Sequence, residues 1–171
     1  PAGRARGSVE LDKNTSPSQL LMSGSTVLVI GQSYQNERVA KGALTDDLLR
    51  APMSRTSITM VDISDPDAPK ISDSVVVDGS VQGARMVGDE ARLVLTSMPM
   101  GLPFVQPQSV LAEETALDMN RRIAATAPLE QWLPHLWRNG KRNDLVPCDR
   151  VTLPDTFAGV ALTSIVSLPM A

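Results

Sequence analysis

The 171-residue sequence has few of the residues on which many functional sites depend. Aromatic residues make up only 3% of it, which argues against a base-stacking surface, and a net charge of −3 gives no basic footprint for nucleic acid. The single histidine, His135, leaves no redundancy for a His-rich zinc site or a Ser-His-Asp triad, and we expect it to be a packing or surface residue. No apolar run approaches the roughly 18 residues of a transmembrane helix. We therefore expect no nucleic-acid partner, no cofactor or metal, and no transmembrane segment in this chain.

Cys148 is the one cysteine, so no disulfide can form within these residues. Three interpretations stay open. Arg150 lies close by and can activate a thiol, a bridge can form to a cysteine outside these residues, or the thiol can serve as a small buried apolar group. We favour the two structural interpretations.

Residues 55–95 contain three apolar stretches separated by short turn signals, with no helical period between them. Residues 56–63 are rich in β-branched side chains, and Asp65-Pro66-Asp67 then supplies a turn, because proline presets φ and aspartate bonds its own backbone. Residues 75–77 resume the strand pattern, and residues 84–95 form a further hairpin. This order predicts consecutive antiparallel strands in a mainly β fold.

The acidic residues of the first turn, Asp62, Asp65 and Asp67, offer oxygen ligands of the kind that calcium prefers. The stretch lacks the closing glutamate and the loop glycine of a calcium-binding hand. We therefore interpret the three aspartates as turn and strand-end residues.

A repeat relates the two halves of the chain. Gly24-Ser25 predicts a hairpin turn, and Gly24 aligns with Gly88 at an offset of 64 residues. Residues 35–54 look inserted, with helical turns expected at 45–49, and removing them leaves about 44 residues, the length of a four-stranded propeller blade. The alignment places apolar residues on apolar residues: Met22 on Met86, Val27 on Ala91, Val29 on Leu93 and Ile30 on Val94.

The predicted organisation is an extended entry segment, 1–19, followed by a propeller portion, 20–171. The first blade covers 20–79, and an incomplete second blade covers 84–171 with an insertion at 99–156. Thr163-Ser164-Ile165 echoes Thr56-Ser57-Ile58, so residues 157–171 form the third strand of the second blade. Both insertions then fall between the second and third strands of their blades, which places them on one rim.

The large insertion is expected to contain a helix at 109–127, capped by Ser109 and stopped by Pro128. Val110, Leu117 and Ala124 recur every seven residues and, with Ile123, predict an apolar stripe that packs on the adjoining blade.

Four residues of the insertion are candidates for a binding surface. Arg121 and Arg122 lie on the polar side of the predicted helix and are a solvated face by default. Trp132 and Trp137 follow at helical spacing, and two large rings on a rim segment suit either an interaction surface or packing of the insertion on its blade. Residues 142–152 predict one further strand, interrupted by Pro147.

The chain carries, in order, VDISDPDAP, VVVDGSVQGARMVGDEARLVL, LPFVQP, a helix, LVPCDRV and TFAGVALTSIVSL. Over residues 20–171 this order resembles the secreted β-propeller domain family of bacteria and archaea. The resemblance implies a propeller of four-stranded antiparallel blades in an exported or cell-envelope protein whose biochemical role is largely unassigned. It also implies several blades, of which this chain holds about two. Two blades cannot close a ring, so we expect other segments or chains to complete the propeller.

Three functions are compatible with these features. The first is a non-catalytic binding or scaffolding module of an exported protein, with a protein or envelope ligand. The second is part of a propeller enzyme, a hydrolase or oxidoreductase, whose active site is completed by other blades. The third is a small stand-alone β domain that oligomerises through open sheet edges. Equivalent positions of the two blades carry apolar rather than acid, base or ligand residues, which favours the first and predicts no enzyme.

Overall fold

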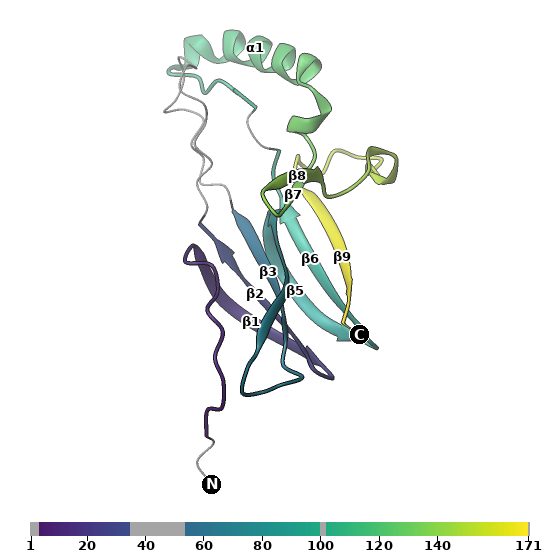
Figure 1. Cartoon of the computed structure of the whole chain (residues 1–171). Coiled ribbons are helices and arrows are strands. Elements are labelled where there is room, and N and C mark those ends of the chain that lie inside the picture. Colours follow the sequence, from purple (N-terminus) through teal and green to yellow (C-terminus); the bar gives the residue numbers. More distant parts are fainter. Residues whose placement is uncertain (1–3, 35–53, 100–101, 171) are drawn as a thin grey trace.

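A computed structural model of the chain describes residues 4–34, 54–99 and 102–170. In this part of the chain two sheets face one another, one of six strands in the order β1-β2-β3-β4-β7-β8 and one of three in the order β5-β6-β9 (Figure 1). Every strand pair is antiparallel. The predicted mainly β fold with a helical insertion is confirmed.

The first four strands of the larger sheet follow one another along the chain: β1 (Thr15–Ser23), β2 (Thr26–Ser33), β3 (Arg55–Asp62) and β4 (Lys70–Asp78). The β1–β2 hairpin turns at Gly24, whose φ of 55° lies in the left-handed region that glycine tolerates best. Asp65 closes the β3–β4 turn, because its side chain accepts a hydrogen bond from the N–H of Asp67 at 3.0 Å. These turns lie where the sequence predicts them.

The smaller sheet contains β5 (Ser80–Val87), β6 (Glu90–Ser97) and β9 (Leu162–Pro169). Its first hairpin turns at Gly88, with a φ of 61°, as Gly24 does in the larger sheet. The pairing registers also agree, since Ile30 lies opposite Ile58 and Val94 lies opposite Ile165. The residues that repeat in the sequence are therefore paired in the same register in both sheets.

The segment between β6 and β9 corresponds to the predicted 99–156 insertion. It carries the 3-10 turns η1 (Val110–Ala112), η2 (Leu129–Gln131) and η3 (Cys148–Arg150), the helix α1 (Glu113–Thr126), and the strands β7 (His135–Arg138) and β8 (Lys141–Asp144). Both insertions leave their sheets at the end where β2 gives way to β3 and β6 to β9 (Figure 1). Most of the first insertion, with the turns expected at 45–49, lies outside the described residues.

The β7–β8 hairpin extends the larger sheet beyond β4, because Val75, Val76 and Val77 pair with Arg138, Trp137 and Leu136. The helical spacing expected around Pro134 was the wrong prediction, because β7 is a strand there. The strand predicted over 142–152 is confirmed only at 142–144, within β8, and the chain continues into the 3-10 turn η3. Proline disfavours the helical region for the residue before it, and the two-residue turn at Asn139-Gly140 has φ values of 54° and 73°, which suit a tight hairpin. Two strands of the larger sheet, β7 and β8, therefore come from the insertion of the second blade.

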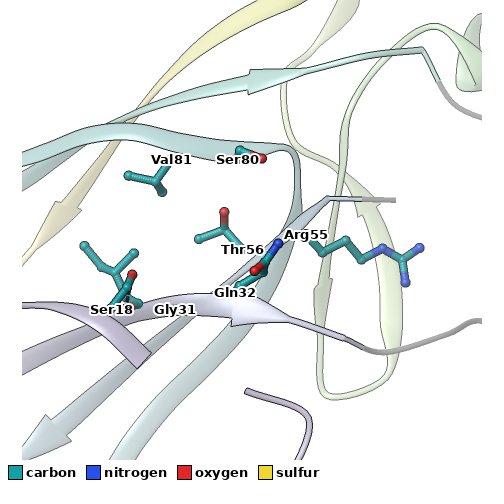
Figure 2. Close-up of a pocket in the computed structure, with 8 residues that line it drawn as sticks. Ser18, Gly31, Gln32, Arg55, Thr56, Ser80 and Val81 are labelled. Carbon is teal, nitrogen blue, oxygen red and sulfur yellow. Dashed lines mark hydrogen bonds between the residues drawn. The ribbon is translucent and has the colours of Figure 1, made fainter. Parts of the chain in front are cut away.

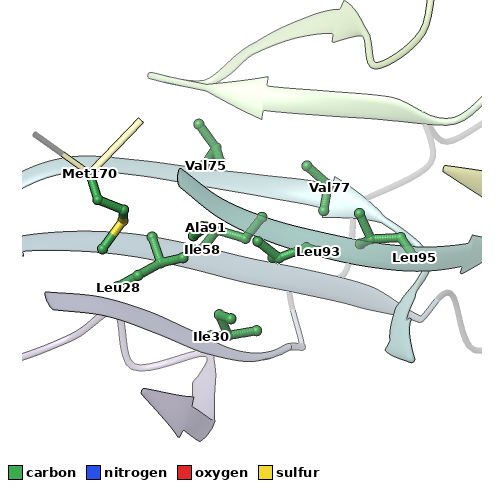
Figure 3. Close-up of a cluster of buried hydrophobic side chains, with 9 residues drawn as sticks. All are labelled: Leu28, Ile30, Ile58, Val75, Val77, Ala91, Leu93, Leu95 and Met170. Atoms are coloured by element: carbon green, nitrogen blue, oxygen red, sulfur yellow. The ribbon is translucent and has the colours of Figure 1, made fainter. Parts of the chain in front are cut away.

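The core lies between the two sheets (Figure 3). Each fully buried aliphatic side chain contributes about 1.5–3 kcal/mol relative to an exposed one. β2 and β3 supply Leu28, Ile30 and Ile58, while β6 supplies Ala91, Leu93 and Leu95 from the opposite side. Val75, Val77 and Met170 complete this buried cluster.

Gly79 joins the two sheets, between the end of β4 and the start of β5. Its φ is 104°, and a Cβ at this position would lie 2.6 Å from the carbonyl oxygen of Thr96. The junction therefore requires glycine for both its backbone conformation and its close approach to β6.

The N-terminal residues differ from the expected entry segment 1–19. β1 begins at Thr15, so residues 15–19 belong to the larger sheet. The segment before it carries Arg6, whose Nε donates to the Asp67 carboxylate at 2.8 Å, and Val9 and Leu11, which line a groove together with Leu20 and Val29. The segment therefore lies against the face of the larger sheet that points away from the core.

Candidate functional site

α1 stands apart from the two sheets (Figure 1). Glu113 and Glu114 lie in its first turn, where carboxylates complement the helix dipole, and Ala127 ends it with an extended backbone ahead of Pro128. The predicted helix at 109–127 is thus confirmed within a few residues. The predicted Ser109 cap is wrong, because its side chain makes no capping hydrogen bond; the 3-10 turn η1 intervenes between Ser109 and the α-helix.

The apolar stripe of α1 does not pack on a blade, contrary to the prediction. Val110 is 79% exposed and Leu117 is 49% exposed. The packed side of the helix carries Ala116, which is 5% exposed, and Asn120, whose amide bonds the backbone N–H and C=O of Val105 at 2.7 and 2.9 Å. A seven-residue period identifies an apolar face of a helix, but it does not show whether that face or another one is packed. Here the hydrogen bonds between Asn120 and Val105 fix a different face.

Arg121 and Arg122 are exposed on α1, on the solvated side where the sequence places them. Arg121 donates to the Asp118 carboxylate at 3.2 Å, three residues earlier on the helix. Exposed pairs of this kind contribute about 0.2–0.5 kcal/mol. Both guanidinium groups are therefore accessible to a binding partner.

The β7–β8 hairpin is fixed to the larger sheet by a buried polar cluster. Asp78 is 2% exposed; its carboxylate accepts from Arg55 Nε at 3.3 Å and from the backbone N–H of His135 at 3.0 Å. His135 Nδ1 lies 3.3 Å from the same carboxylate. The Arg55 guanidinium also lies 4.0 Å from the centre of the Trp137 ring. Breaking a buried pair of this kind costs about 3–5 kcal/mol, so the cluster holds the hairpin firmly.

The lone histidine is therefore a packing residue, as expected, but its partners could not be read from the sequence. His135 is 5% exposed, and among the described residues its Nε2 has no hydrogen-bond partner, with Asp144 Oδ1 at 4.0 Å. Its partner Asp78 lies 57 residues earlier, at the end of β4. In the sequence, Asp78 and the following Gly79 have the pattern of an ordinary turn after a strand. Arg55 and Asp78 are the residues of this cluster that the sequence did not single out.

Trp132 and Trp137 do not form one surface. Trp132 is half-buried and meets Phe104 edge-to-face, with ring centres 6.5 Å apart, at the foot of α1. Trp137 lies on β7 against Arg55 and the His135 ring. Neither ring joins Arg121 or Arg122, so the four candidates are divided among the helix, its foot and the hairpin.

Cys148 lies at the start of η3 and is exposed, with no disulfide within the described residues. Its interpretation as a small buried apolar group is wrong, because the residue is exposed. A bridge to a cysteine outside these residues stays a prediction.

The aspartates of the β3–β4 turn are turn residues, as interpreted. Asp62 accepts from the backbone N–H of Ser64 at 2.8 Å; this bond, a second one from the Ser64 hydroxyl and the charge of Lys70 lower the pKa of Asp62. Asp67 pairs with Arg6. Within residues 4–34, 54–99 and 102–170, no cluster of three or more histidine, cysteine or acidic side chains is placed to hold a metal ion.

A small pocket of about 170 Å³ opens between the sheets, lined by β1, β2, β3 and β5 (Figure 2). Two of its hydroxyls are already engaged, since Thr56 donates to the carbonyl of Gly79 at 2.8 Å and Ser18 to that of Ile30 at 3.3 Å. The Arg55 side chain points away from it (Figure 2). The other short polar side chains that line the pocket are Gln32 and Ser80.

None of the described helices combines the length and the apolar character that crossing a membrane requires. No curated protein and no solved structure matches the chain. A model of the Beta propeller domain family matches residues 2–171, in agreement with the two open sheets and their repeated register. The chain therefore belongs to the Beta propeller domain family.

Proposed function

We propose that the chain is a non-catalytic binding or scaffolding module of an exported or cell-envelope protein, and that α1 is its recognition element. The observation that carries this proposal is the exposure of apolar side chains on a helix that stands off the sheets. Leu111 is 96% exposed, and Val110, Leu117 and Met119 are exposed with it. Clustered exposed apolar groups rimmed by charges are typical of interaction surfaces.

The attachment of the insertion supports the same role. Asp78 and His135 fix the hairpin on one side of the insertion, and the Asn120–Val105 clamp holds α1 to its own approach segment. A recognition element held in place before binding loses less conformational entropy when its partner arrives. The insertion is thus fixed to the larger sheet at the hairpin, and α1 is fixed to its approach segment at Asn120.

The alternative, part of a propeller enzyme completed by other blades, would need acid, base or nucleophilic groups presented to a substrate. The Asp78–His135 pair is the constellation closest to such chemistry, and both side chains are buried. No observation on the described residues favours the alternative, so the binding module is the function we propose.

Site-specific photo-crosslinking tests the proposal. A photoreactive amino acid at Leu111, in the turn η1 that leads into α1, is compared with one at Leu153, which is 81% exposed in a loop of the same insertion. The reaction is run in cells that produce the protein and repeated with excess unlabelled protein as competitor. We expect a discrete adduct from position 111 that the competitor removes. Equal adducts from both positions, or none from position 111, would contradict the proposal.

Fractionation of the same cells tests the exported or envelope location. We expect the protein outside the cytoplasmic fraction, because the order of its motifs resembles that of secreted propeller proteins. Recovery in the cytoplasmic fraction alone would exclude that part of the proposal and leave the role of α1 to the crosslinking result.

A further inference from the structure

The surface of α1 is organised along its length in both charge and size. Glu113 and Glu114 lie in the first half of the helix, and Arg121 and Arg122 lie in the second. The large apolar residues Val110 and Leu111 precede the helix, whereas Ala124 and Ala125 end it. The two ends are therefore opposite in charge and complementary in bulk.

One exposed seam of α1 combines these features. At about 100° per residue, Glu114, Leu117, Arg121 and Ala124 fall along one side of α1, and Val110 precedes them in the 3-10 turn η1. The buried Ala116 points about 100° away from Leu117, so packing against the approach segment leaves this seam open. The seam reads acidic, apolar, basic, small, with Leu117 between the two charges.

We propose that α1 associates with α1 of a second copy of this chain, in antiparallel orientation, through this seam. This inference rests on the proposed role of α1 as the recognition element and names its partner. With Leu117 near the twofold axis, Glu114 of each copy faces Arg121 of the other.

Parallel association is disfavoured by the same residues. It would place Glu114 beside Glu114 and Arg121 beside Arg121, and like charges across an interface oppose binding. An antiparallel pair instead brings Arg121, which pairs with Asp118 of its own helix at 3.2 Å, within reach of Glu114 of the other copy on either side of an apolar contact. Charge complementarity thus selects both the partner and its orientation.

The expected interface is small. α1 has 14 residues and is about 21 Å long, so the buried area lies below the roughly 1,200 Å² of stable complexes. The association is therefore weak for isolated chains and is expected at high local concentration. It should also weaken as ionic strength rises, because its ion pairs are exposed.

A charge-exchange experiment on the full chain tests the inference by sedimentation velocity over a range of protein concentrations. Glu114→Arg and Arg121→Glu each turn two attractive pairs into two repulsive ones, so each variant alone should self-associate roughly tenfold more weakly or worse. Mixing the two variants restores complementary pairs, so the mixture should associate about as well as the wild type. The double variant should do the same by itself.

Arg122→Glu is the matched control, because it makes the same change in charge at a position about 140° from Leu117 on the helix. It should leave self-association unchanged. Far-UV circular dichroism checks that α1 is retained in each variant, since both single changes oppose the helix dipole.

Three results would overturn the inference: a monomeric wild type at every concentration, association that the exchanges do not alter, or a mixture that fails to recover. Unaltered association would assign contact to the open sheets instead. If the wild type is monomeric while position 111 crosslinks to a different protein, the recognition role stands and only the self-association falls. If no competed adduct forms either, both proposals fall.

Discussion

Equivalent positions of the two sheets differ in their exposure to solvent. Ile30 and Ile58 lie opposite each other in the larger sheet and are 1% and 2% exposed. Their counterparts in the smaller sheet, Val94 and Ile165, also lie opposite each other, but they are 36% and 72% exposed. The same row of the repeat is core in one sheet and surface in the other.

The difference follows from how the sheets stack. The core face of the smaller sheet is formed by the alternate residues, Leu93 among them, which is fully buried. The larger sheet therefore turns the row with Ile30 and Ile58 toward the shared core, whereas the smaller sheet turns the alternate residues toward it. We call this arrangement front-to-back stacking, because opposite faces of the repeat meet in the core. Front-to-back stacking leaves Val94 and Ile165 exposed on the far side of the smaller sheet.

The largest contrast is expected from truncating the two equivalent isoleucines. Ile58→Ala should lower the free energy of unfolding by about 4 kcal/mol, because it removes buried methylene groups and leaves a cavity. Ile165→Ala should change it by less than about 0.5 kcal/mol. Urea unfolding of both variants measures the pair. Similar losses at both positions would break the comparison.

The ion pairs of the two sheets also differ in burial, and we expect the buried pair of the larger sheet to contribute more stability than the exposed pair of the smaller sheet. Asp78→Ala should cost about 3 kcal/mol, since it removes the buried acceptor of Arg55 and His135. Glu90→Ala in the smaller sheet removes an exposed partner of Arg92, 3.4 Å away, and should cost under about 0.5 kcal/mol. Urea unfolding measures both. In a Trp132→Phe background, fluorescence of Trp137 also reports whether the hairpin detaches in Asp78→Ala. An unchanged Trp137 signal with full stability would contradict the role given to the cluster.

The glycines at the sheet junction and at the hairpin tip form a third contrast. Gly79→Ala should cost about 3 kcal/mol, because it combines a strained backbone with a Cβ that meets Thr96. At Gly88 a Cβ meets nothing within 4 Å, so Gly88→Ala should cost only about 1 kcal/mol of backbone strain. Thermal unfolding ranks the two. The reverse order would mean that the junction is more adaptable than its geometry indicates.

The smallest effect concerns the β3–β4 turn. Hydrogen bonds from Ser64 lower the pKa of Asp62 in the folded chain. A lowered folded-state pKa means that the stabilisation is present above the unfolded-state pKa and is lost as pH falls through the folded-state value. We therefore expect acid to loosen this turn, and Asp62→Asn to remove that part of the pH dependence. An NMR titration of the Asp62 carboxyl checks the sign; a pKa at or above the ordinary aspartate value would contradict it.

The sequence was informative wherever one local signal decided the structure. Gly24 and Gly88 marked hairpin tips, the β-branched run marked β3, and the echo of Ile58 in Ile165 predicted the shared register. Long-range pairing was not accessible in this way. The meeting of Asp78 with His135 depends on the hairpin crossing to β4, and no local pattern records that crossing.

The prediction that the apolar stripe of α1 packs on the adjoining blade was wrong for a related reason. Its period was correct, but the helix is held by Asn120 and Ala116 rather than by Leu117. A polar clamp to one backbone segment outweighed the apolar pattern, because no sheet surface in the described structure lies within reach of the stripe. The exposed stripe then became the feature on which the proposed function depends.

Thiol labelling of the two equivalent isoleucines tests front-to-back stacking most directly. Cysteine replaces either Ile58 or Ile165 in a Cys148→Ala background, and a water-soluble maleimide is added under native conditions. We predict that the cysteine at 165 reacts at nearly the rate of an unfolded chain, while the cysteine at 58 reacts at least about a hundredfold more slowly, because labelling there requires opening of the core. Equal protection of both thiols, or equal reactivity, would contradict the account.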